Sequence, residues 1–115
     1  IEVKGKNVAV IGRGILVGKP IANWLINGGA TISVLNSQTL NPIGYTLMAY
    51  IIISGAGKPG LIKPEMVKEG VVIIDAGGDV EPVVAEKASL FTPIIGGVGP
   101  ITVAMVFKNL IELNK

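Results

Sequence analysis

The sequence contains no cysteine and no histidine among its 115 residues. Without cysteine the chain cannot form a disulfide, a thiolate metal site or a cysteine nucleophile. Without histidine it also lacks the commonest general base and the commonest metal ligand of proteins. We therefore predict no metal site and no catalytic residue in this chain on its own.

Charged residues are scarce as well. They make up 16% of the chain, and 10 basic against 8 acidic residues give a net charge of +2. No basic run or aromatic stripe marks a nucleic-acid surface, so we expect no nucleic-acid partner. No apolar run reaches the roughly 18 to 20 residues that span a bilayer, so we expect no membrane partner and a cytoplasmic setting. The opening residues, Ile1 to Lys4, include neither an initiator Met nor a secretory signal, which predicts that the chain begins inside a longer polypeptide.

What the chain does have is apolar residues, which make up 50% of it, with a mean hydropathy of +0.64. Its length fits one compact domain. This excess of apolar residues is typical of a parallel sheet buried on both faces, and also of a domain that a second domain or a partner chain partly covers. We expect both.

Apolar runs alternate with breaks rich in glycine and proline, as expected for strands that alternate with helices. The predicted strands are Asn7–Ile11, Ala30–Leu35, Tyr50–Ser54, Val71–Ile74 and Leu90–Pro93. The predicted helical segments are Val17–Ile26, Lys63–Lys68, Pro82–Ala88 and Thr102–Asn114, with Leu40–Ala49 left ambiguous by Pro42 and Gly44. Short strands joined by crossovers predict an α/β fold of three layers, in which helices cover both faces of a mostly parallel, twisted sheet.

A glycine-rich turn follows the first predicted strand. Gly12, Gly14 and Gly18 are spaced one residue wider than in the usual dinucleotide-binding turn. Gly12 permits a tight turn, Gly14 permits close approach of a pyrophosphate, and the following helix offers free N–H groups. The alternative is a glycine-rich turn that binds nothing. Between a strand and a helix, the pattern favours a Rossmann-like nucleotide-binding domain.

The end of the second predicted strand bears on which dinucleotide binds. An NAD-binding domain usually has an acidic residue there for the ribose 2′-hydroxyl. This chain has Asn36 and Ser37, which can donate hydrogen bonds to a 2′-phosphate, and Arg13 can supply an opposing charge. The pattern favours NADP over NAD, unless Arg13 is only a solvated loop residue.

Several segments together resemble the bifunctional methylenetetrahydrofolate dehydrogenase/cyclohydrolase family, in its C-terminal NAD(P)-binding domain. The resemblance covers nearly the whole chain and is strongest in its last third. The segments that carry it are Gly5–Pro20, Leu35–Thr39, Gly57–Gly60, Met66–Gly70, Val72–Asp75 and Gly96–Met105.

The resemblance implies roles for particular residues. The residues that match the family's cofactor-binding positions are Gly12, Arg13, Gly14, Ser37 and Gly78, with Ser37 at the 2′-phosphate and Gly78 near the nicotinamide. The residues that match its folate-facing strip, which can equally be a tight turn before the last helix, are Gly97, Gly99 and Pro100. The implied reaction is hydride transfer from methylenetetrahydrofolate to NADP, followed by hydrolysis of the methenyl product. The family's catalytic lysine lies in an N-terminal domain that this chain does not include.

Some residues depart from the family's pattern. Gly14 stands where the family usually has a serine, Asn36 replaces a histidine, and Ile94–Ile95 replaces Val-Pro. The loop after Asp75 is about ten residues shorter than in the family. Either the shorter loop weakens cofactor binding near the nicotinamide, or the given sequence lacks residues of this loop. These departures leave two alternatives open, a non-catalytic nucleotide-binding or assembly module and a different NAD(P)-dependent dehydrogenase.

Four further features complete the predictions. Asp75, at a strand end, is interpreted as a carboxylate that braces a loop rather than as a base. Lys58 is either a phosphate or folate contact or a solvated turn residue, and Asp79 has no evident partner. The weakly charged segment Pro42–Tyr50, or the last helix, is predicted to pack on another subunit in a homodimer.

Overall fold

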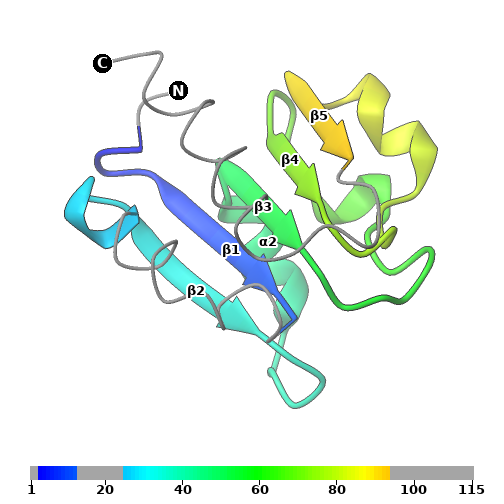
Figure 1. The fold of residues 1–115 in the computed structure, drawn as a ribbon, viewed down its shortest axis with the longest axis horizontal. Helices are drawn as coiled ribbons and strands as arrows, with labels where there is room; N and C mark the ends of the chain where they lie inside the picture. Colours follow the sequence, from blue (N-terminus) through cyan, green and yellow to red (C-terminus); the bar gives the residue numbers. More distant parts are fainter. Residues whose placement is uncertain (1–2, 13–24, 94–115) are drawn as a thin grey trace.

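A computed structural model describes residues 3–12 and 25–93 of the chain. Five strands form one parallel sheet in the order β2-β1-β3-β4-β5 (Figure 1). The strands are β1 (Asn7–Ile11), β2 (Thr31–Leu35), β3 (Ile51–Ser54), β4 (Val72–Asp75) and β5 (Leu90–Pro93). The prediction of an α/β, Rossmann-like fold is confirmed, and each predicted strand lies within one residue of its observed ends.

The strands form because their apolar residues are buried on both faces of the sheet. Val8 and Val10 of β1 pack on one face, whereas Ala9 and Ile11 pack on the other. The same alternation holds along β3 and β4, in which every residue is buried. A strand with two buried faces reads as a continuous apolar run, which is why these segments could be recognised from sequence.

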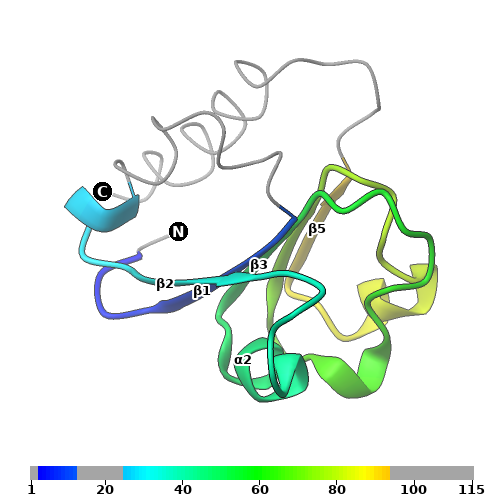
Figure 2. The same ribbon diagram turned by 90° about the horizontal axis from the view of Figure 1, so that it is seen from below.

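One face of the sheet carries the short helices. Helix α2 (Pro42–Met48) and two 3-10 helices, η2 (Pro64–Met66) and η3 (Pro82–Glu86), all lie on this face (Figure 2). The ambiguous segment Leu40–Ala49 is therefore helical in its centre. The predicted helical pieces at Lys63–Lys68 and Pro82–Ala88 are confirmed as shorter 3-10 turns, each entered at a proline.

The end of the first predicted helix is also described. Residues 25–27 are helical, and Gly29 follows with a φ of 86°. The Gly29 N–H donates to the Ile26 carbonyl, and the Ala30 N–H donates to the Leu25 carbonyl. This pair of bonds is a Schellman motif, so the helix ends within one residue of its predicted end at Ile26. The rest of Val17–Ile26 and all of Thr102–Asn114 lie outside the described residues. No helix within residues 3–12 and 25–93 is long and apolar enough to cross a membrane.

Candidate functional site

The strand order places a topological switch point at the carboxyl end of β1. The chain passes from β1 to β2 on one side, and β3 then lies on the other side of β1. Loops that leave neighbouring strands in opposite directions open a crevice at the carboxyl edge, and open α/β sheets bind their ligands there.

Gly12 lies at this point and has no room for a side chain. Its φ is 95°, and a Cβ built on it would lie 2.7 Å from both the carbonyl carbon and the carbonyl oxygen of Gly55. The Gly12 N–H donates to the Leu35 carbonyl at 3.3 Å, and the Gly55 N–H donates to the Ile11 carbonyl at 2.8 Å. Gly12 therefore makes the tight turn predicted from the sequence. Arg13 and Gly14 lie outside the described residues.

The loop after β2 folds into a small polar turn. The Gln38 N–H donates to the Asn36 Oδ1 at 2.8 Å, and the Asn36 N–H donates to the Thr39 Oγ1 at 2.8 Å. The Asn36 carbonyl oxygen also accepts from the Thr39 N–H, at 3.1 Å. Asn36 thus braces the turn with its side-chain oxygen, which leaves Ser37 exposed at the turn, as its predicted role requires.

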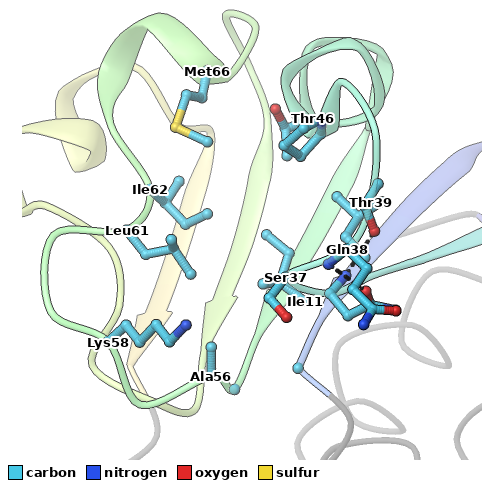
Figure 3. A pocket seen from close by; sticks show the side chains of 15 residues that line it. Ile11, Ser37, Gln38, Thr39, Thr46, Ala56, Lys58, Leu61, Ile62 and Met66 are labelled. Carbon is cyan, nitrogen blue, oxygen red and sulfur yellow. Dashed lines mark hydrogen bonds between the residues drawn. The ribbon is translucent and has the colours of Figure 1, made fainter.

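A cavity of about 710 Å³ opens between these two features and the loop after β3 (Figure 3). We call it the edge cavity. Its walls come from the ends of β1 and β2, the loop 36–39, helix α2 and the segment 55–66. Its size falls in the usual range for a small-molecule or cofactor site. The lining includes Gly12, Asn36 and Ser37 of the predicted site residues, and Lys58 is the only charged residue that lines it within residues 3–12 and 25–93.

Asp75 braces the loop that follows β4, as predicted. It is 5% exposed, and its Oδ1 accepts from the N–H groups of Gly77 at 3.2 Å and Asp79 at 3.0 Å. Its Oδ2 accepts from the Val80 N–H at 3.2 Å. With three bonds to its own loop, the carboxylate holds the turn that follows β4.

The prediction that Asp79 has no partner is wrong. Asp79 is fully buried, and its carboxylate accepts three hydrogen bonds from the end of β3 and the loop beyond it. The donors are the Ser54 hydroxyl, the Ala56 N–H at 2.8 Å and the Lys58 N–H at 2.6 Å. Asp79 therefore ties the loop after β4 to the loop that lines the edge cavity.

Sequence reasoning missed Asp79 because all three donors lie more than twenty residues before it. The two strand ends held one clue to this network. Ser54 and Asp75 end neighbouring parallel strands and pair in register, so the loops that follow them leave the sheet side by side. Gly77 then lets the chain fold back, since a Cβ there would lie 2.7 Å from the Asp79 Oδ2 and 2.8 Å from the Gly57 nitrogen.

Of the remaining predicted site residues, Gly78 belongs to the part of the chain that the structure describes. Gly78 is exposed in the loop after β4, with a φ of 71°, and it does not line the edge cavity. Its predicted place near the nicotinamide stays a prediction. Gly97, Gly99 and Pro100 lie outside the described residues.

Comparison with known proteins identifies relatives over the whole chain. Residues 1–115 match the family model described as the tetrahydrofolate dehydrogenase/cyclohydrolase NAD(P)-binding domain. The chain is 47% identical to the bifunctional protein FolD of Campylobacter hominis and 40% identical to that of Thermus thermophilus. The match to the C. hominis protein covers all of this chain and 44% of that protein, so the chain spans less than half the length of that relative.

Solved structures give the same result. The chain matches the crystal structure of the bifunctional FolD enzyme of Campylobacter jejuni with a TM-score of 0.76 and 38% identity, over 97% of this chain and 44% of the other. It matches the Trypanosoma brucei enzyme, whose structure is a complex with NADP cofactor and inhibitor, with a TM-score of 0.73 and 36% identity. That match covers 95% of this chain and 43% of the other.

The lengths of the matches bear on the short loop. The match to the C. hominis protein runs over 126 aligned positions, whereas this chain has 115 residues, so eleven positions have no residue here. This difference agrees in size with the loop after Asp75, which the sequence predicts to be about ten residues shorter than in the family.

Proposed function

This chain belongs to the family of tetrahydrofolate dehydrogenase/cyclohydrolase NAD(P)-binding domains, and we propose that it binds NADP as the cofactor domain of a larger enzyme. In the proposed enzyme, NADP accepts a hydride from methylenetetrahydrofolate, and the methenyl product is then hydrolysed. The folate and the catalytic lysine belong to an N-terminal domain. We also propose the cytoplasmic setting that the sequence predicts.

The observation that carries the proposal is the edge cavity at the switch point of the sheet. A dinucleotide needs a place where the backbone can approach its phosphates, and Gly12 provides one because no side chain fits there. Ser37 lines the same cavity, and none of the described residues that line it is acidic. These walls therefore present no carboxylate that would repel a 2′-phosphate, which favours NADP.

The residues of this chain would bind and orient the cofactor. Ser37 donates a hydrogen bond to the 2′-phosphate, and Arg13 supplies an opposing charge in the first turn. Gly78 is proposed to contact the nicotinamide end of the cofactor, and Gly97, Gly99 and Pro100 are proposed to face the folate. The chain thus holds the cofactor against the substrate, and the chemistry depends on the second domain.

The test uses the full-length protein, and its first readout is formation of NADPH from NADP and methylenetetrahydrofolate. Titration calorimetry then compares the native protein with Arg13→Ala. We expect micromolar binding of NADP and a Kd roughly ten- to hundredfold higher in the variant, because a charge-assisted bond to phosphate contributes roughly 1.5–3 kcal/mol.

The matched control is Lys4→Ala, which removes an exposed lysine just before β1, at the opposite edge of the sheet. It is expected to leave the Kd unchanged. If the full-length protein neither binds NADP nor oxidises methylenetetrahydrofolate at saturating concentrations, the proposed function is wrong.

The proposal includes a homodimer, which is supported by the exposed face of α2. No Asp, Glu, Lys or Arg occurs between Lys19 and Lys58. On and beside α2, large apolar side chains face outward, with Leu40 88% exposed and Met48 58% exposed. The other exposed members of this group are Ile43, Tyr45 and Leu47. An apolar surface without charge is typical of the buried centre of a subunit interface.

We expect Leu47→Glu to shift the full-length protein from dimer to monomer, because the interface would then bury an unpaired charge. Sedimentation velocity measures the change. The control is Val83→Glu on η3, where the side chain is 48% exposed compared with 43% for Leu47, so the cost to the monomer is similar. A native protein that is monomeric at high concentration, or a Leu47→Glu variant that stays dimeric, would contradict this prediction.

A further inference from the structure

In the part of the chain that the structure describes, the edge cavity has one charged group on its lining and a polar turn facing it. Lys58 leaves the loop after β3, and its side chain extends toward the side of the cavity that Ser37 and Gln38 form (Figure 3). The two sides come from segments about twenty residues apart in sequence. A ligand that fills the space between them therefore meets an ammonium group on one side and hydrogen-bond donors on the other.

The backbone of Lys58 is held in place. Its N–H donates to the buried Asp79 carboxylate at 2.6 Å, and its carbonyl accepts from the Leu61 N–H at 3.2 Å. The preceding residue, Gly57, has a φ of 72°, which turns the chain into this position. The side chain therefore starts from a fixed point on the rim of the cavity, unlike that of a lysine on an unbraced loop.

The polar turn on the other side carries no charge of its own. The Asn36 side-chain oxygen accepts a hydrogen bond from the Gln38 N–H, and Ser37 has a neutral hydroxyl. A 2′-phosphate carries more than one negative charge near neutral pH, and neutral donors do not balance it. A cation within reach of the same group adds a charge-assisted bond.

We propose that Lys58 contacts the 2′-phosphate of NADP from the side of the edge cavity opposite Ser37, and so helps to set the preference for NADP over NAD. The inference rests on the proposed function. NAD has a hydroxyl in place of this phosphate, so Lys58 strengthens the binding of NADP and not that of NAD. A lysine that contacted the pyrophosphate would favour both cofactors equally.

The experiment measures Kd by titration calorimetry for NADP and for NAD, with the full-length protein and no folate present. Lys58→Gln is expected to raise the Kd for NADP about tenfold and to change the Kd for NAD by less than about twofold. A tenfold rise corresponds to the loss of one hydrogen bond to a charged group. Lys58→Arg keeps the charge and is expected to keep the preference for NADP. Raising the salt concentration is expected to weaken NADP binding less in Lys58→Gln than in the native protein.

The matched control is Lys63→Gln, which removes an exposed lysine that does not line the cavity. It is expected to change neither Kd. An unchanged NADP affinity in Lys58→Gln, or an equal loss for NADP and NAD, would overturn the proposal. If the native protein binds no NADP, it is the proposed function itself that fails, so the two failures are distinguishable. Thermal unfolding of each variant checks that a loss of affinity does not come from misfolding.

Discussion

Gly12→Ala is expected to abolish measurable NADP binding and to lower the free energy of unfolding by about 2–4 kcal/mol. The added methyl group would lie 2.7 Å from the Gly55 carbonyl and 2.9 Å from the Ala56 nitrogen. These are backbone atoms held in the sheet and in the Asp79 network, so they cannot move aside as a flexible side chain would. The φ of 95° adds strain, because L-residues rarely adopt it.

Calorimetry with NADP and chemical denaturation of the full-length protein measure the two effects. The control is Gly70→Ala, in the turn before β4, where φ is 81° and a Cβ would meet no atom within 4 Å. That variant carries the backbone strain without the collision, so we expect it to lose about 1 kcal/mol and to bind NADP normally. A Gly12→Ala protein that binds NADP with native affinity would show that the closeness of β1 to the loop after β3 is not what forms the site.

The strands could be predicted from the sequence because a strand that is buried on both faces has a continuous run of apolar residues. Apart from Asn7, Ser54 and Asp75 at their ends, β1, β3 and β4 consist of Val, Ile and Ala, and a glycine follows β1 and β3. The small errors at the strand ends have a physical cause. Tyr50 is apolar and half-buried, but its N–H already bonds to the Asn7 carbonyl before the β3 ladder begins.

Helix α2 could not be predicted with the same ease, because its sequence departs from the usual pattern. Pro42 begins the helix instead of breaking it, after Asn41 adopts a φ of 53°. Gly44 also has a local reason, since a Cβ there would lie 2.8 Å from the Asn41 Nδ2. Only Thr46 of the helix is buried, so the apolar residues around it do not mark the side that packs on the sheet.

The residues of the candidate site also fall into those that could be predicted from the sequence and those that could not. The place of Gly12 and Ser37 at this edge could be predicted because Gly12 directly follows β1 and Ser37 comes two residues after β2, and the carboxyl ends of parallel strands share one edge. The Asp79 network could not, because it joins loops that only the fold brings together. No fixed spacing in a sequence identifies a buried carboxylate that accepts hydrogen bonds from distant backbone N–H groups.

Asp79→Asn is expected to lower the free energy of unfolding by about 2 kcal/mol and to loosen the loop that carries Lys58. An amide has one acceptor oxygen where the carboxylate has two. If that oxygen keeps the Ser54 and Ala56 bonds, the amide NH₂ group meets the Lys58 N–H, and two donors then face each other in a buried place. Asp79→Ala leaves all three donors without their acceptor, and we expect a larger loss of about 3–5 kcal/mol.

Hydrogen exchange separates this positioning role from a general loss of stability. In Asp79→Asn we expect the Ala56 and Lys58 amides to exchange faster, while the amides of β1 stay protected to the extent that global unfolding allows. Glu86→Gln, an exposed carboxylate on η3, is the control and should change neither set. A double-mutant cycle with Ser54→Ala should give a coupling energy of roughly 1 kcal/mol, because the two side chains share one bond. If the 55–58 amides exchange at the native rate in Asp79→Asn, the carboxylate does not position the loop, and the placement of Lys58 must depend on other contacts.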